Sequence, residues 1–447
     1  MSSSTTTYRI TKHSPEFLPV ELVSKIMTHL GPHDILSLRL TSRALESKVS
    51  LRDFTPLFTY KAIELDQRRL ETMEYVISHS NLGRLLQHCT LIAVLPGDGT
   101  CTRPNFDEYV PLLTKLFLSI KQHCPGGKLP SLCLNVDVGP KTPTEWLFEG
   151  VALRVKRDKA RTAAELFKVT MAALHESQLS IEQLDLFSNV LECGLALSAF
   201  LKLTPQFAST PVFSSLKEFG GKFSLHPWER EEAISEGAPP PSGCNQDHVI
   251  KLLRALLKMS AFAPELESLY ILWYANGEDS RDEPKVQIRE GDISKFKCLK
   301  ECSLHGLMIP EQDLLRFMKA VRPTTWTITD SFLSHGTWAS IHGYLTSADS
   351  PVTYYHLDAN YERVSANPGF WYPPYQVHYN MPGEPKIEYR DKKMAGPYTL
   401  TRHGSKAKEE IRYEALRVER KHVEEFRRWN NDKRLEYGPN TDYSFRY

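Results

Sequence analysis

A short apolar pattern recurs along the middle of this 447-residue chain, and it constrains the fold more than any other feature. In each copy two apolar residues stand three positions apart, and a third follows two positions later, with cysteine accepted as apolar. The copies are Leu86/Cys89/Leu91, Leu129/Leu132/Leu134, Ile181/Leu184/Leu186, Leu216/Phe219, Leu266/Leu269/Ile271 and Leu299/Cys302/Leu304. The fourth copy is weak, because Gly221 takes its third place. Each copy, and the later segments 325–329 and 352–357, predicts a strand with one buried face.

Helical patterns separate these predicted strands, most clearly over residues 160–175, 248–262 and 311–321. A strand and a helix that alternate in this way resemble a leucine-rich-repeat solenoid, in which neighbouring units stack into one continuous core. The middle apolar residues of successive copies are 43, 52, 35, 50 and 33 residues apart, which is longer than the usual period. The resemblance is therefore to an irregular array with long helices and loops on its outer side. Chance recurrence of the pattern in a leucine-rich α/β protein is the open alternative.

Alternate side chains of such strands should face solvent on the other side of the sheet. The residues inside the apolar pairs are Thr90, Cys133, Asp185, Gly220, Tyr270 and Ser303, and those one strand step further are Asn135, Phe187, Lys222, Leu272 and His305. Exposed aromatic and aliphatic residues on such a face mark recognition more often than stability. The candidate target-binding residues are Asp185, Phe187, Tyr270, Leu272, Ser303 and His305. Loops that cover this face are the competing explanation.

Residues 15–55 form a separate, leucine-rich block near the N-terminus. Leu22, Ile26 and Leu30 recur at four-residue steps and predict an apolar stripe on a helix that begins near Pro19. Two further short helices are expected before residue 50. Three short helices in so small a unit enclose too little interior to bury this surface. Either the rest of the chain or a separate partner must therefore cover it.

This block resembles the F-box motif over about a tenth of the chain. The resemblance rests on Leu18-Pro19, Glu21-Leu22, Ile26, Asp34-x-Leu36-x-Leu38-Arg39 and Ser42-Arg43. An aromatic residue often follows the final arginine in the family, whereas Ala44 stands here. The resemblance implies binding to the Skp-type adaptor that links F-box proteins to a cullin scaffold. By position, the apolar contact with that adaptor would come from Leu18, Pro19, Leu22, Ile26, Leu30, Leu36 and Leu38.

The remaining boundaries follow from composition. Residues 1–14 are polar and predicted to be disordered, and residues 56–360 form the predicted recognition domain. Residues 361–404 are rich in Pro and Tyr, which favours an extended segment that covers the end of the array, a docking peptide being the alternative. Residues 405–447 are expected to contain a charged helix that packs on the body rather than a coiled coil. Its apolar stripe would consist of Ile411, Ala415, Val418, His422, Phe426 and Trp429.

Charge and missing motifs argue against several classes of function. The chain has 55 Lys+Arg against 54 Asp+Glu, so we expect neither nucleic-acid nor membrane binding. We expect no secretory signal or membrane span, and reduced cysteines in a cytoplasmic or nuclear location. Phosphate-binding glycine loops, a Gly-x-Ser-x-Gly turn, and the zinc and calcium ligand spacings are missing from the sequence. We therefore expect no catalytic residue, no cofactor and no metal site.

The expected fold class is α/β, with a short N-terminal three-helix F-box, an irregular leucine-rich-repeat-like solenoid and a C-terminal helix. We interpret the chain as a substrate-recognition adaptor of a cullin-RING (SCF-type) ubiquitin ligase. It would act as a monomer within a heteromeric complex, bind a protein target and perform no bond chemistry itself. The alternative is a non-catalytic scaffold whose N-terminal helices pack on its own body, without a role in ubiquitin ligation.

Overall fold

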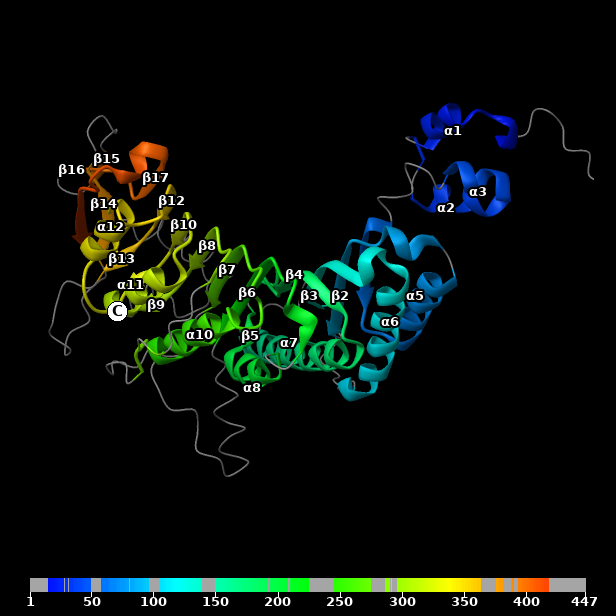
Figure 1. Cartoon of the computed structure of the whole chain (residues 1–447), viewed down its shortest axis with the longest axis horizontal. Helices are drawn as coiled ribbons and strands as arrows, with labels where there is room; N and C mark the ends of the chain where they lie inside the picture. Colours follow the sequence, from blue (N-terminus) through cyan, green and yellow to red (C-terminus); the bar gives the residue numbers. More distant parts are fainter. Residues whose placement is uncertain are drawn as a thin grey trace, which may run out of the picture.

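The computed structural model describes most of the chain between residues 15 and 417. The described residues are 15–27, 29–30, 32–49, 58–79, 81–95, 105–138, 149–191, 193–207, 210–224, 245–274, 286–289, 291, 296–362, 375–380, 387–389 and 393–417. Figure 1 shows an elongated arrangement with the N-terminal helices at one end and the C-terminal strands at the other. Helices and sheets are combined throughout, which confirms the predicted α/β class.

The N-terminal block consists of short helical segments. They are η1 (Pro15–Phe17), α1 (Val20–Met27), α2 (Pro32–Thr41) and α3 (Arg43–Val49). Pro19 stands directly before α1, and its carbonyl accepts hydrogen bonds from the backbone N–H groups of Leu22 and Val23. Ser42 caps α3, because its hydroxyl oxygen accepts a hydrogen bond from the Leu45 backbone N–H at 3.2 Å. Local sequence signals thus fix where these helices begin.

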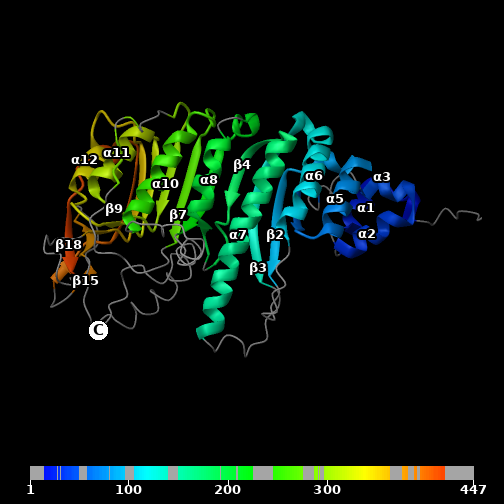
Figure 2. The same cartoon turned by 90° about the horizontal axis from the view of Figure 1, so that it is seen from below.

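One sheet of eleven strands runs through the rest of the molecule (Figures 1 and 2). Nine strands pair in the parallel order β1-β2-β3-β4-β6-β7-β8-β10-β12, while β17 joins antiparallel at the end and β5 pairs with β6. Their bounds are β1 (Tyr60–Glu64), β2 (His88–Leu95), β3 (Lys128–Val138), β4 (Ser180–Leu186), β5 (Leu195–Ala196), β6 (Glu218–Ser224), β7 (Ser268–Tyr274), β8 (Glu301–His305), β10 (Thr325–Thr329), β12 (Tyr354–Asp358) and β17 (Thr399–His403). Every strand predicted from the sequence lies in this sheet.

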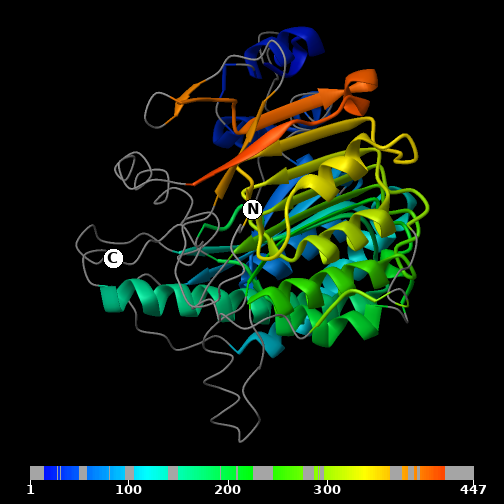
Figure 3. The same ribbon diagram turned by 90° about the vertical axis from the view of Figure 1, so that its left-hand side faces the viewer.

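Helices connect successive strands and lie along one side of the sheet. They are α5 (Gln67–His79), η2 (Asn81–Leu85), η3 (Phe106–Glu108), α6 (Tyr109–His123), η4 (Pro125–Gly127), α7 (Glu149–Ser177), α8 (Leu197–Phe207), η6 (Pro211–Phe213), α10 (Asn245–Met259), α11 (Glu311–Val321), α12 (Ala339–Thr346) and η8 (Gly404–Lys408). In Figure 2 the helices α7, α8 and α10 lie in front of the strands. Figure 3 shows α7 along one side of the sheet. The helices predicted over 160–175, 248–262 and 311–321 are parts of α7, α10 and α11.

The helix-covered side of the sheet carries one continuous row of buried side chains. The register places the middle apolar residue of every sequence copy in this row, which reads Cys89, Leu132, Leu184, Phe219, Leu269, Cys302, Trp326 and Tyr355. All of these side chains are buried. A parallel sheet covered by helices requires apolar side chains on that face, and they join one hydrophobic cluster that extends from Ile63 to Ile411.

The last three parallel strands end in sharp turns of the same geometry. Gly306, Asp330 and Ala359 stand at equivalent positions after β8, β10 and β12, with left-handed φ values of 69°, 48° and 48°. The turns lead into a second, five-stranded sheet. Its strands are β9 (Met308–Ile309), β11 (Phe332–Leu333), β13 (Tyr361–Glu362), β14 (Tyr375–Tyr379) and β18 (Tyr413–Arg417), and a separate pair consists of β15 (Ile387–Tyr389) and β16 (Lys393–Ala395).

Asn360 ties two of these turns together. Its side chain is buried, and its amide nitrogen donates a hydrogen bond to the Ile328 carbonyl at 3.0 Å. Its amide oxygen accepts a hydrogen bond from the Ser331 backbone N–H at 3.2 Å. An apolar residue at position 360 would leave both backbone groups without this partner. The asparagine therefore links the turn at Asp330 to its own turn at Ala359.

The predicted C-terminal helix is wrong over its described part. Residues 404–408 form η8, and residues 413–417 form β18, which pairs antiparallel with β14. Ile411 and Ala415, expected on one helical stripe, therefore lie before and within a strand. Backbone hydrogen bonds to β14 decide the conformation, and apolar spacing along the chain carries no information about that partner strand. Val418, His422, Phe426 and Trp429, like residues 1–14 and 363–374, lie outside the described residues.

The second sheet and α12 enclose a histidine in an apolar site. The imidazole of His342 is buried, and its ring centroid lies 5.8 Å from that of Tyr379 and 4.8 Å from that of Tyr413. Neither ring nitrogen has a hydrogen-bond partner within the described part of the chain. Burial therefore lowers the pKa of His342 to about 3.

We expect the protein to lose stability as the pH falls from the unfolded pKa of His342, 6.5, towards the folded pKa of about 3. In this range the unfolded chain binds a proton that the buried imidazole rejects. His342→Phe should flatten the dependence of the thermal unfolding midpoint on pH. Some slope should remain, because burial also lowers the pKa of His248, to about 4. His335→Phe, at an exposed histidine, is the control, and equal slopes in wild type and both variants would contradict the expectation.

Candidate functional site

The N-terminal block has a small core of its own. Val23 and Met27 of α1 are buried against Ile35 of α2 and Leu45 of α3. The Lys48 ammonium group donates hydrogen bonds to the carbonyl oxygens of Glu16 and Leu18, the latter at 2.8 Å. This clamp from α3 fixes the segment that enters α1, so the side chains on either side of Pro19 are held in place.

The outer side of the same segment carries apolar side chains that the described chain leaves exposed. Phe17 is 58% exposed, Val20 36%, Leu22 49% and Ile26 43%. These four residues, called the N-terminal apolar surface below, account for four of the ten large exposed hydrophobic residues in the described part of the chain. A concentration of this kind within ten residues of sequence is typical of a protein-binding surface.

The predicted adaptor-binding residues divide between this surface and the core beneath it. Pro19, Leu22 and Ile26 are exposed. Leu18, Leu30 and Leu38 are half-buried and pack against the small core, so they support the surface from below. The side chain of Leu36 lies outside what the structure describes. Sequence reasoning missed Phe17 and Val20, which flank the Leu18-Pro19 pair and are exposed beside it.

The block also contacts the rest of the chain. Phe58, Val76 of α5 and Leu85 of η2 are half-buried and pack against the small core. The body of the protein therefore covers part of the apolar surface of the block. This was one of the two possibilities that the sequence left open, the other being a separate partner. The N-terminal apolar surface is the part that it leaves uncovered.

The second candidate surface is the side of the large sheet opposite the helices, called the open face below. The register aligns two rows of side chains there, and the row predicted from the sequence contains Thr90, Cys133, Asp185, Gly220, Tyr270 and Ser303. All six residues are half-buried. The neighbouring row contains His88, Ser131, Gln183, Glu218, Ser268 and Glu301. These two rows hold three carboxylates and no lysine or arginine, so this part of the face is acidic.

Two residues predicted to be exposed on this face are buried. Phe187 follows the last residue of β4, and its left-handed φ of 62° breaks the strand alternation, so its side chain joins the main core. Leu272 packs with Tyr274 and Tyr270 in a small cluster of its own. Lys222 is also buried, with its ammonium group donating to the Val190 carbonyl at 3.0 Å. The prediction that Phe187 and Leu272 are exposed on this face is therefore wrong.

Gly220 lies between Asp185 and Tyr270 on the open face, and the place without a side chain at this position is called the notch below. A Cβ atom at this position would meet the Asp185 carboxylate and the Tyr270 Cβ at 3.9 Å, and the Ser188 hydroxyl at 3.7 Å. The Ser188 backbone N–H donates to the Asp185 carboxylate at 3.1 Å, which holds that carboxylate beside the notch. Single-sequence reasoning gives no signal for Ser188, because it reaches the site through the turn after β4.

Tyr270 stands on the other side of Gly220, and its ring contacts that of His305. Their ring centroids lie 4.7 Å apart, and the His305 Nδ1 forms a 2.6 Å hydrogen bond with the Thr329 hydroxyl. The two aromatic side chains therefore come together from adjacent strands, β7 and β8. Ser303 lies beside Tyr270 in the same row.

Three of the described cysteine thiols are held in their protonated form. Burial raises the pKa of the Cys89 and Cys193 thiols to about 12, and burial together with the Asp185 carboxylate does the same for Cys133. These thiols are therefore protonated at neutral pH. Within the described ranges, no group of three or more His, Cys, Asp or Glu side chains is placed to hold a metal ion. No helix among them is long and apolar enough to span a membrane.

Comparison with known proteins identifies the N-terminal block. Residues 16–57 match the family model of the F-box domain. These residues include η1, α1, α2 and α3 and with them the whole N-terminal apolar surface. A search of curated proteins finds no match for the chain.

Proposed function

We propose that this chain, which carries an F-box domain at residues 16–57, is the substrate-recognition adaptor of a cullin-RING (SCF-type) ubiquitin ligase. An F-box domain generally implies such an adaptor role and binding to a Skp-type protein. The observation that carries the proposal is the exposure of Phe17, Val20, Leu22 and Ile26 on one clamped segment. Burying such side chains contributes about 1.5–3 kcal/mol each, enough for a stable contact with a partner.

The body behind the F-box is proposed to be an irregular leucine-rich-repeat-like array that selects the target. One continuous inner row and three equivalent turns support this assignment. The row passes from Cys302 to Trp326 and on to Tyr355 in steps of 24 and 29 residues, which are ordinary leucine-rich-repeat lengths. The longer steps earlier in the chain contain the long helices, such as α7.

The target is proposed to bind the open face around the notch at Gly220. Asp185, Tyr270, Ser303 and His305 surround or adjoin this notch and offer a carboxylate, two rings and a hydroxyl group. A bound target would be held close to the ubiquitin-loaded enzyme on the same cullin scaffold, which raises the effective concentration of its lysines. On this proposal the chain is non-catalytic, acts as a monomer within the complex, and works in the cytoplasm or nucleus.

We expect Gly220→Gln to block target binding without loss of stability. A Cβ at this position makes only ordinary van der Waals contacts, and the longer side chain would fill the notch. Proximity labelling in cells should lose target proteins with this variant only, while its unfolding free energy stays within about 0.5 kcal/mol of the wild-type value. Thr401→Gln, on the exposed end strand β17, is the matched control. Unchanged labelling in Gly220→Gln would place target recognition elsewhere.

The alternative is a scaffold without a ligase role, whose N-terminal helices serve its own body. Packing of Phe58, Val76 and Leu85 against the F-box core favours this reading. The ligase proposal requires a Skp-type adaptor to bind the N-terminal apolar surface, whereas the scaffold alternative requires no such partner. Affinity purification of the full-length protein with the ligase blocked should recover a Skp-type adaptor and a cullin in near-stoichiometric amounts. A soluble monomer that recovers neither would support the scaffold instead.

A further inference from the structure

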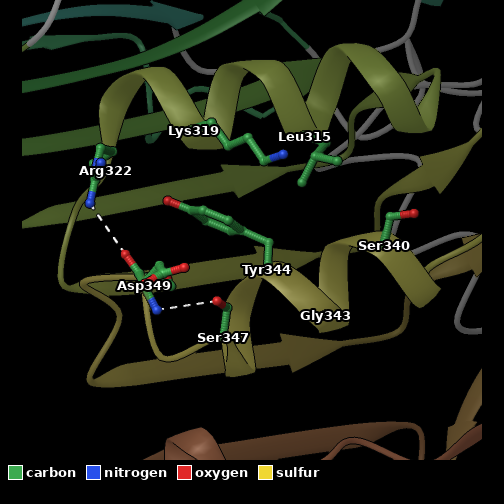
Figure 4. Close-up of a pocket in the computed structure, with 9 residues that line it drawn as sticks. Leu315, Lys319, Arg322, Ser340, Gly343, Tyr344, Ser347 and Asp349 are labelled. Atoms are coloured by element: carbon green, nitrogen blue, oxygen red, sulfur yellow. Dashed lines mark hydrogen bonds between the residues drawn. The ribbon is translucent and has the colours of Figure 1, made fainter.

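A second hollow in the molecule lies far from both surfaces described so far. It is a cavity of about 480 Å³ between α11 and α12, in the helix layer near the C-terminal end of the sheet (Figures 1 and 4). This volume falls within the range of small-molecule sites, about 300–1,000 Å³. In Figure 4, Leu315 and Lys319 lie on the α11 side, and Tyr344 and Ser340 lie on the α12 side. The cavity thus combines an apolar wall with polar groups.

Two full positive charges stand on the α11 side. Lys319 is exposed in the last turn of α11, and its ammonium group has no hydrogen bond or ion pair within the described chain. Arg322 follows as the C-cap, and its guanidinium group donates to the backbone carbonyl of Asp349 at 3.3 Å. Cations at a helix C-terminus also interact favourably with the helix dipole, which is the ordinary structural explanation for them. The helix dipole does not account for the hydrogen-bonding groups on the opposite, α12 side of the cavity.

The conformation of Arg322 is unusual for an arginine. Its φ of 49° and ψ of 45° are left-handed, which costs a residue with a Cβ roughly 1–2 kcal/mol. Glycine, the commonest residue at this position of a helix end, adopts this conformation freely. The chain therefore has a charged side chain beside the cavity at a position where glycine would adopt the backbone conformation without this cost.

The α12 side offers hydrogen-bonding and stacking groups. The Tyr344 hydroxyl donates to the Met318 carbonyl at 3.2 Å, which fixes the ring as a wall of the cavity. The Ser340 hydroxyl has no partner within the described chain and lines the same cavity. Leu315 adds an aliphatic surface opposite the ring. A ligand here would meet an aromatic wall, an aliphatic wall, a free hydroxyl and two cations.

We propose that this cavity binds a phosphate monoester carried on a small aromatic or aliphatic body. A phosphate monoester carries a charge of about −1.5 to −2 at neutral pH, which matches the positive charges of Lys319 and Arg322 on the α11 side of the cavity. The body would lie between Leu315 and the ring of Tyr344. Asp349 lines the cavity as well, so its carboxylate opposes an anion and limits the affinity. The site is independent of the F-box and of the open face.

Calorimetric titration of the full-length protein with phenyl phosphate tests the proposal. We expect saturable binding, at least fivefold tighter than that of inorganic phosphate, because phosphate alone lacks the body. Lys319→Gln should weaken phenyl phosphate about tenfold. Lys258→Gln, in the last turn of the neighbouring helix α10 and outside the cavity, should leave it unchanged. Asp349→Asn should strengthen binding about threefold, opposite in direction to Lys319→Gln. Damage to the structure of the cavity would not produce such a gain in affinity.

Arg322→Gly separates binding from folding. It removes the guanidinium group but relieves the left-handed conformation, so we expect weaker binding and an unfolding midpoint no lower than that of wild type. A capped phosphotyrosine peptide then distinguishes the source of the phosphate. Tighter binding than phenyl phosphate indicates a phosphorylated protein, and exclusion of the peptide indicates a free metabolite. No saturable binding of phenyl phosphate, or equal losses in Lys319→Gln and Lys258→Gln, overturns the proposal.

Discussion

Leu22→Ala combined with Ile26→Ala is expected to weaken binding to a Skp-type adaptor by about 100- to 1,000-fold, because it removes the aliphatic centre of the N-terminal apolar surface. Both side chains are nearly half exposed on α1 and lie opposite the small F-box core. Each truncation removes about 2 kcal/mol of apolar burial in the complex but little within the free chain. The unfolding midpoint of the variant should therefore stay close to that of wild type.

The measurement is co-purification, followed by titration of the adaptor into the purified chain. The control is Leu118→Ala combined with Leu191→Ala, because these leucines are 40% and 58% exposed outside the F-box. This double variant removes similar exposed aliphatic groups and should bind the adaptor as wild type does. Equal adaptor binding by the Leu22/Ile26 variant and the control would show that the N-terminal apolar surface does not bind the adaptor. The position of Leu18, half-buried in the core, makes it a poorer choice, since its loss would disturb folding as well.

Trp326→Ala should cost about 3–5 kcal/mol of unfolding free energy, a large part of the 5–15 kcal/mol typical of a folded protein. Trp326 is fully buried in β10, between Cys302 of β8 and Tyr355 of β12 in the inner row. Removal of the indole would leave a cavity in the single cluster that runs through the array. Urea denaturation should show a lower midpoint. The slope of the unfolding free energy against urea concentration reports whether the array still unfolds as one unit.

Trp326→Phe separates volume from hydrogen bonding at the same position. The indole N–H has no hydrogen-bond partner within the described chain, so its loss removes an unsatisfied buried donor. We expect this variant to lose less than half as much stability as Trp326→Ala. Equal losses in the two variants would mean that the inner row tolerates no change of shape at all, and wild-type stability in Trp326→Ala would show that the row does not carry the core.

Local sequence patterns anticipated much of the array. An apolar residue at every second position can bury only one face of a strand, and so the sequence copies placed Cys89, Leu132 and Leu184 on the helix side. The same alternation placed Asp185, Tyr270 and Ser303 on the open face. The F-box was visible as a resemblance to a short motif, and its apolar surface, larger than three short helices can enclose, predicted a covering partner or body. These features depend on neighbours within a few residues.

The failures come from backbone turns, packing and strand pairing that apolar spacing does not record. Phe187 leaves the strand alternation through a left-handed turn, and Leu272 joins a cluster with the neighbouring Tyr274, so neither remains on the surface. Ala415 has helical spacing to its neighbours but pairs with Val377 of β14. No local pattern contains these contacts, and hydrogen bonds between strands override a helical preference.

The N-terminal block shows most clearly what each level decides. The sequence alone determined that residues 15–55 have helical apolar spacing, resemble an F-box and carry more apolar surface than so small a unit can bury. Only the tertiary structure decided which side chains form that surface. Packing of α1, α2 and α3, with Phe58 and Val76 of the body, buries Val23 and Met27 and leaves Leu22 and Ile26 outside. Whether a side chain is buried depends on the residues that folding brings into contact with it. Spacing along the sequence shows only which residues share one face of a helix.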